Sequence, residues 1–209
     1  MRQGEQTIRS HTIVVAAPLL PELRLHLLTE SCPLWRASEA EAARAGLADP
    51  WWAFCWPGGQ ALARYVLDHP EIVRGKRVLD FGSGCAVEAL AALRAGAASA
   101  VAADVDPVAA TAARLNADLN GLTVETATRD LVGERVDADL VLAGDVFYEK
   151  DLASRALPWL RSVGVPVLIG DPSRGFLDLD GLTRLATYRA HADGDTAGTV
   201  LRETSVYRL

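Results

Sequence analysis

The sequence predicts an α/β fold: one domain built on a seven-stranded, mostly parallel sheet that ends in an antiparallel hairpin. From Lys76 onward, short apolar runs alternate with stretches of helical periodicity, which is typical of parallel strands with helices on both faces. Two alternating runs at the end of the chain, joined by the turn-rich DGDTAG, indicate the hairpin. With 209 residues, 50% of them hydrophobic, the chain suffices for one such domain and not for two.

Residues 1–50 lack this regular alternation, and we expect them to form an N-terminal accessory segment with some helix, in front of a main domain at 51–209. Within the segment, Ser38 to Glu41 matches a capping box that opens a short helix, and Gly46 can close it. A longer helix is expected after WPGG at 56–59, because apolar residues recur at helical spacing until Pro70.

The remaining elements follow from periodicity and from the residues that begin and end helices. Pro107 stands at a first helical position and Gly121 just past a helix end, which is the usual preference. Parallel strands are expected at 77–81, 100–103, 123–127, 139–143 and 165–170, and helices at 87–95, 107–120 and 151–161, the last kinked by Pro158. A short helix near 179–185 should precede the hairpin strands at 187–192 and 199–209.

Composition and charge disfavour several classes of function. The formal net charge is −6 and no run of Lys and Arg occurs, which argues against nucleic-acid binding. No apolar segment approaches the roughly 18 residues of a membrane span. The apolar stretch 13–20 is short and contains Pro18, which argues against a signal peptide. Three cysteines without ligand spacing predict reduced thiols in a cytosolic protein and no metal site: Cys32, Cys55 and Cys85.

A strand that ends in an acidic residue leads into a glycine-rich turn in VLDFGSGCA. In dinucleotide sites such a turn holds a pyrophosphate, which the carboxylate of Asp80 would repel. Asp80 instead favours a cofactor with an ammonium group, and Asp104, which ends the next strand, suits a ribose diol. S-adenosylmethionine carries both groups and no phosphate. Three small residues would let the backbone approach it closely: Gly82, Ser83 and Gly84. The alternative is that Asp80 merely caps the following helix.

The fourth parallel strand runs into GDVFYEKDL, which places Asp145, Phe147 and Tyr148 at the carboxyl end of the sheet, where ligands of such sheets bind. If S-adenosylmethionine donates its methyl group to a lysine, Asp145 can orient the ammonium group of that lysine. Because an ordinary carboxylate has a pKa of about 4, we expect it to position the lysine rather than to deprotonate it. Phe147 or Tyr148 could offer a ring face to the cation. Alternatively, Phe147 belongs to the core and Tyr148 covers the sheet edge.

These motifs together resemble a known family. Residues 50–209 resemble the Rossmann-like, seven-stranded S-adenosylmethionine-dependent methyltransferases. More specifically, the chain from Trp52 to about Leu160 is similar to the lysine methyltransferases of the electron transfer flavoprotein beta subunit. The similarity is carried by the segments WAFCWPGGQALARYVLD, VLDFGSGC and GDVFYEKDLA. The resemblance implies transfer of methyl groups to lysines of that folded protein, with S-adenosylhomocysteine as product. Because the N-terminus does not look like a mitochondrial transit peptide, we expect a bacterial cytoplasmic enzyme.

The resemblance also implies roles for individual residues. Trp56 and Asp145, in the W-P-x-G and D-x-x-Y segments, should flank cofactor and acceptor. Asp130 stands where the family often contacts the adenine amine, although it could instead cap a turn. Ala86 is a departure, because the family's glycine turn often ends in a third glycine.

Three other interpretations of the sequence remain open. The chain could be an N-methyltransferase that acts on a small molecule or a ribosomal protein. It could also be a cofactor-binding module that has lost catalysis. A nicotinamide-dependent dehydrogenase is disfavoured by Asp80.

Overall fold

The computed structural model describes residues 2–32, 35, 44, 50–191 and 201–209. The expected capping box at 38–41 with Gly46, and the turn sequence DGDTAG, lie outside the described residues. Within them, the helices are α1 (Arg2–His11), α3 (Pro57–Asp68), α4 (Val87–Arg94), α5 (Pro107–Leu119) and α6 (Lys150–Ser162), with 3-10 turns at Trp51–Ala53 (η2) and Pro70–Ile72 (η3). None of these helices is long and apolar enough to cross a membrane.

The described residues form a mixed sheet of seven strands, as the sequence predicts. Its strands are β3 (Arg77–Phe81), β4 (Ser99–Asp104), β5 (Glu125–Thr128), β6 (Leu140–Gly144), β7 (Val167–Asp171), β8 (Thr183–His191) and β9 (Leu201–Arg208). The spatial order is β5-β4-β3-β6-β7-β9-β8, in which the first five strands run parallel and β9 is antiparallel to both of its neighbours.

The short helix expected near 179–185 is wrong. The chain turns at 180–181 and enters β8 at Thr183, so that the last three residues of the expected helix are strand. The reason is tertiary: β8 pairs with β9 along its length, with a register shift between Arg184 and Ala186. Backbone pairing with a distant strand has overridden a weak local preference for helix.

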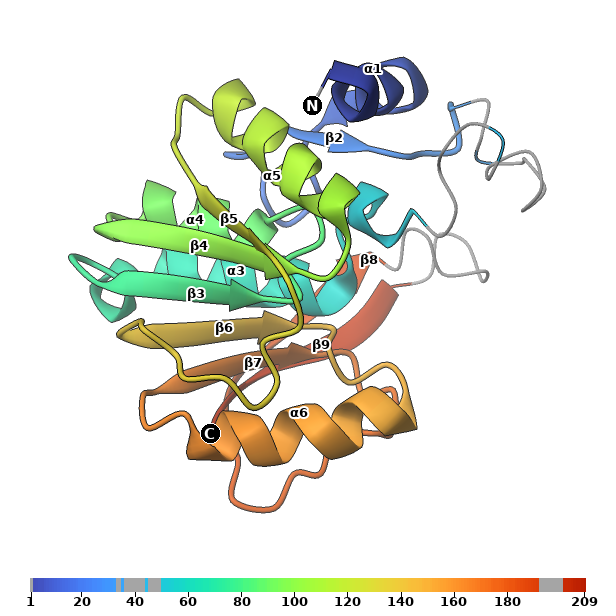
Figure 1. Cartoon of the computed structure of the whole chain (residues 1–209). Coiled ribbons are helices and arrows are strands. Elements are labelled where there is room, and N and C mark those ends of the chain that lie inside the picture. The colour runs from blue at the N-terminus through green and yellow to red at the C-terminus, as the bar shows by residue number, and fades with distance from the viewer. Residues whose placement is uncertain (1, 33–34, 36–43, 45–49, 192–200) are drawn as a thin grey trace.

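Side chains of each parallel strand point alternately to the two faces of the sheet, and each face has its own core. Val78, Ala100 and Leu140 face a core that includes residues of α3, α4 and α5. Leu79 and Val141, one position further along their strands, face the core under α6. Figure 1 shows α6 (orange) on one side of the sheet, with α3 and α4 behind the other side. Helices on both faces confirm the predicted layers.

The described part of the N-terminal segment packs against the main domain. It forms α1 and a two-stranded antiparallel sheet of β1 (Ile13–Val15) and β2 (Leu25–Leu27). Ile8 of α1 is completely buried in a cluster with residues of η2 and α5, and Figure 1 shows α1 and β2 beside α5. That residues 1–50 act as an accessory segment, separate from a domain at 51–209, stays a prediction.

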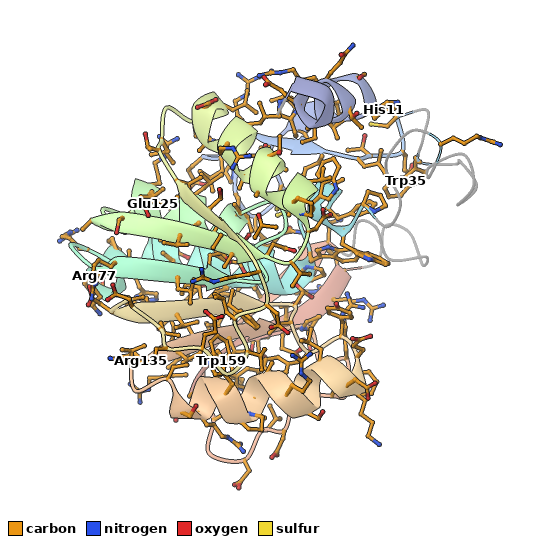
Figure 2. The ribbon with its side chains drawn as sticks, in the orientation of Figure 1. His11, Trp35, Arg77, Glu125, Arg135 and Trp159 are labelled. Carbon is orange, nitrogen blue, oxygen red and sulfur yellow. The ribbon has the colours of Figure 1, made fainter. Side chains whose placement is uncertain are left out.

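The two ends of the parallel strands differ in their role. At the amino ends, Arg77 forms ion pairs with Asp137 and Asp139, which fix the start of β6 beside β3. Figure 2 shows Arg77 at this edge of the molecule and Trp159 of α6 under the sheet, where its ring centre lies 4.8 Å from that of Phe81. The carboxyl ends carry the acidic residues on which the functional site is built.

Candidate active site

The glycine-rich turn after β3 has the backbone that its sequence predicts. Gly82 and Gly84 have φ angles of 71° and 49°, in the left-handed region that glycine enters without strain. A methyl group on Gly82 would lie 2.8 Å from Cγ1 of Val146, so the turn also packs too closely for a side chain there. Ser83 is buried within the turn. The backbone of the turn therefore packs directly against the side chain of Val146, which follows β6.

Asp80 is completely buried beneath this turn. Its Oδ2 accepts a hydrogen bond from the N–H of Ala89, in the first turn of α4, at 2.9 Å, so the capping alternative is correct for one oxygen. The other, Oδ1, is buried and accepts no hydrogen bond from the described residues. Burial, and to a lesser extent the charge of Asp104, raises the pKa of Asp80 to about 7. A cationic group nearby would relieve this uncompensated burial, which fits a cofactor with an ammonium.

Asp104 holds the glycine turn to the end of β4. Its Oδ2 accepts the N–H of Gly84 and its Oδ1 the N–H of Asp106, both at 2.9 Å. Two backbone donors fix the plane of the carboxylate, and each oxygen keeps a further lone pair for a hydroxyl donor. The role of Asp104 toward a ribose stays a prediction, and the geometry is compatible with it.

Asp145 follows β6 and is held by the start of α3. Its Oδ2 accepts the N–H of Gly59 at 3.0 Å, and its own N–H donates to the carbonyl of Gly170. The Asp145 backbone is left-handed, with a φ angle of 55°, and its side chain is only 9% exposed. Burial raises the pKa of Asp145 to about 7, against the opposing effects of the Gly59 hydrogen bond and of Arg174.

The close approach of α3 to this residue depends on glycine. A methyl group on Gly58 would lie 2.3 Å from the carbonyl oxygen of Gly170 and 2.5 Å from Oδ2 of Asp145. Only a residue without Cβ fits there. The WPGG segment therefore places the helix N-terminus, with its outward N–H groups, against the acidic residue that follows β6.

Trp56 and Arg174 complete the surroundings of Asp145. Trp56 precedes α3, and its Nε1 donates to the carbonyl of Trp51 at 3.0 Å. Arg174 follows β7; its Nε lies 3.8 Å from Oδ1 of Asp145 and its Cζ 5.7 Å from the Trp56 ring centre. None of the sequence motifs described above includes Arg174. Its signal was the sequence DPSR directly after the fifth parallel strand, at the edge where ligands bind.

Comparison with known proteins connects this geometry to a family. The chain is 47% identical over 173 residues to the electron transfer flavoprotein beta subunit lysine methyltransferase of Xenopus laevis, with 80% of this chain and 69% of that protein covered. For the protein of the same description from Danio rerio, identity is 41% over 185 residues, and coverage is 86% and 70%. The chain belongs to this family. It spans about two thirds of the length of these relatives.

Two further comparisons agree with this assignment at a coarser level. A family model for ribosomal protein L11 methyltransferase (PrmA) matches residues 60–146. The fold is similar to magnesium protoporphyrin IX methyltransferase from Synechocystis PCC 6803 with bound SAM, at a TM-score of 0.53 and 15% identity, with 72% and 79% of the chains covered. The structural likeness shows the fold alone, and membership of the lysine methyltransferase family confirms the predicted S-adenosylmethionine-dependent methyltransferase class.

The structure shows the surroundings of Asp130 and the backbone of Ala86, the two further positions that the family resemblance singles out. Oδ1 of Asp130 accepts a hydrogen bond from the N–H of Val132, and Oδ2 forms an ion pair with Arg155 of α6. These contacts lower the pKa of Asp130, and they match the turn-cap alternative. Contact with an adenine amine stays a prediction. Ala86 takes a left-handed φ of 64° at the start of α4, a conformation that the family's glycine would adopt without strain.

The two aromatic residues of the D-x-x-Y segment are separated by the structure. Phe147 is fully buried in the core under α6. Its ring face is therefore not available to an acceptor in this structure, as the core alternative predicts. Tyr148 is 54% exposed, and partial burial followed by the charges of Glu149 and Asp104 raises the pKa of its hydroxyl. Of the two, Tyr148 is the residue that an acceptor can contact.

The structure adds a buried carboxyl group that the sequence analysis did not identify. Glu88 of α4 is 3% exposed, and a methyl group on Gly144 would overlap its Oε1. Burial, then the charge of Asp80, raises the pKa of Glu88 well above its usual range. Cys55 and Cys85 beside it are buried thiols without a disulfide partner. No metal-binding cluster occurs in the part of the chain that the structure describes.

Proposed function

We propose that this protein transfers methyl groups from S-adenosylmethionine to lysine side chains of the beta subunit of electron transfer flavoprotein. The observation that carries the proposal is Asp145: a buried carboxylate at the carboxyl edge of the sheet, fixed by Gly59, whose second oxygen accepts no hydrogen bond from the described residues. A carboxylate oxygen with unused acceptor capacity suits a lysine ammonium. The identity to proteins named for this substrate supplies the choice of acceptor.

The site residues divide into a donor side and an acceptor side. When bound, S-adenosylmethionine would supply a methyl group from its sulfonium to the lone pair of a neutral lysine nitrogen, with cleavage of the carbon–sulfur bond and S-adenosylhomocysteine as the product. Asp80 and Asp104, with the glycine turn of Gly82, Ser83 and Gly84, would hold the donor. Asp145 and Tyr148 would orient the acceptor, with Trp56 between the two sides.

Burial of Asp145 revises the role expected from the sequence. A carboxylate with an ordinary pKa is a poor base at neutral pH, which was the reason to assign it to positioning alone. With a pKa of about 7, Asp145 is matched to the pH at which it acts and can also accept the proton that the lysine loses. We assign it both roles: it orients the ammonium, then takes its proton as the nitrogen becomes a nucleophile.

The test is transfer of a radiolabelled methyl group from S-adenosylmethionine to the purified flavoprotein beta subunit, with the lysines located by peptide mass. Labelling of specific lysines supports the proposal, and an unlabelled subunit contradicts it. Ribosomal protein L11 belongs in the same assay, because residues 60–146 match the model of its methyltransferase. The bacterial cytoplasmic location stays a prediction, since the two relatives described above are vertebrate proteins.

A further inference from the structure

Arg174 lies beside two residues of the proposed site, Asp145 of the acceptor side and Trp56. Its Nε is 3.8 Å from Oδ1 of Asp145, and its Cζ is 5.7 Å from the Trp56 ring centre. The side chains of Arg174 and Asp145 are 21% and 9% exposed, so the ion pair is largely shielded from water. A cation of the protein itself is thus held by the carboxylate and the indole that an incoming lysine would use.

The contact between Arg174 and Asp145 is loose. A distance of 3.8 Å exceeds that of a hydrogen bond, and Oδ1 of Asp145 accepts none from the described residues. A guanidinium that served only to fix a carboxylate would form two parallel hydrogen bonds with it. The observed geometry leaves Oδ1 open to a better donor, and a lysine ammonium has three N–H groups on a compact head.

The loop that carries Arg174 is anchored at Ser173 and has open space at Gly175. On the strand side, Oδ1 of Asp171 accepts the N–H of Ser173 at 2.7 Å. On the far side, Gly175 has a φ angle of 92°, and a methyl group on it would meet no atom within 4 Å. A movement of the loop at Gly175 would therefore meet no steric clash there, while the Ser173 hydrogen bond keeps the loop tied to the end of β7.

We propose that Arg174 is an internal placeholder for the substrate lysine: it holds the acceptor position until a lysine on a docked protein displaces it. The inference rests on the proposed assignment of Asp145 to the acceptor side. A free amine competes with Arg174 for Asp145 only at the concentration of the amine in solution. A lysine on a docked protein competes for Asp145 at the much higher effective concentration of a tethered group. Arg174 thus selects protein-bound lysines against small amines.

The experiment measures binding of n-butylammonium, the cationic end of a lysine, to the full chain at about pH 9, where Asp145 is ionised and the amine is still charged. The signal is the indole N–H resonance of Trp56, assigned by its loss in Trp56→Phe. Arg174→Met removes the charge and keeps the length of the side chain, and Arg174→Lys keeps the charge. Arg9→Met, on α1 in an exposed pair with Glu5, is the matched control.

Arg174→Met should bind n-butylammonium at least about tenfold more tightly than the wild type, while Arg174→Lys and Arg9→Met stay close to it. In the wild type, the Arg174 Nε–H resonance should shift in step with the Trp56 signal, which tests displacement even if a variant fails to fold. Equal or weaker binding by folded Arg174→Met, or an Arg174 resonance that does not respond, would overturn the inference. This result does not depend on which protein is methylated, so an unlabelled flavoprotein subunit would remove only the proposed substrate.

Discussion

The backbone N–H of Gly59 donates a hydrogen bond to Oδ2 of Asp145 at 3.0 Å. The two residues are 86 positions apart in the chain, one in the first turn of α3 and the other directly after β6. Because the helix start is positioned by two glycines packed on the strand ends, the carboxylate has a fixed orientation and little access to water. Its position and its raised pKa therefore have the same structural cause.

Asp145→Asn should abolish most of the methyl transfer. The amide keeps the size of the side chain but can neither attract an ammonium nor accept its proton, so kcat/KM should fall by about 100- to 10,000-fold. Cofactor affinity, measured by calorimetry with S-adenosylhomocysteine, should change by less than about threefold. The control is Asp137→Asn, at the opposite end of the strands, where the side chain is 92% exposed. Equal losses of activity and cofactor affinity would move Asp145 to the donor side.

The pH dependence should reveal a single proton loss near neutrality. If Asp145 takes the proton of the lysine, the reactive species are an ionised Asp145, with a pKa of about 7, and a charged lysine. Below about pH 7, log kcat/KM at saturating cofactor should rise with a slope of about one against pH, and above it the profile should be flat until lysine itself loses its proton at about pH 10. In Asp145→Asn the residual activity should follow a slope of about one throughout. A wild-type profile without a break near neutrality would exclude Asp145 as proton acceptor.

Gly58→Ala should damage stability and activity together. The added methyl group would overlap the carbonyl of Gly170 and Oδ2 of Asp145, and forcing atoms into a packed interior costs about 1–3 kcal/mol. Chemical denaturation measures this loss, and the kinetic assay should show lower kcat because the carboxylate is displaced. Gly4→Ala, in α1, is the control, because its new methyl group would lie 4.0 Å from Oγ1 of Thr111, the nearest atom outside the backbone of α1. There alanine should be neutral or slightly stabilising.

Asn116→Asp should weaken both the N-terminal packing and the glycine turn. Oδ1 of Asn116 accepts the N–H of His26 in β2, while its Nδ2 donates to the carbonyl of Cys85 at 2.9 Å. Asp cannot donate while ionised, so a buried carboxylate would face the Cys85 carbonyl, at a cost of about 2–4 kcal/mol. We also expect weaker S-adenosylhomocysteine binding. Asn120→Asp, one helical turn further and more exposed, should cost less; the opposite ranking would contradict this role.

The sequence by itself determined the features that depend on local chemistry. The alternation of apolar strands and helices, the glycine turn after Asp80 and the proline and glycine helix ends predict their elements to within a few residues, because periodicity and backbone preference act over short distances. Asp80, Asp104 and Asp145 were also predictable as a group, since the carboxyl ends of parallel strands meet at one edge of a sheet.

Only the tertiary structure decided what surrounds those residues. Strand pairing turned the expected helix at 179–185 into the start of β8, and packing placed Phe147 in the core while Tyr148 stayed exposed. Arg174 reaches Asp145 and Trp56 from a loop after a different strand. The raised pKa of Asp145 is caused mainly by burial. Burial and contact between distant segments arise when the whole chain packs, so no local pattern of residues records them.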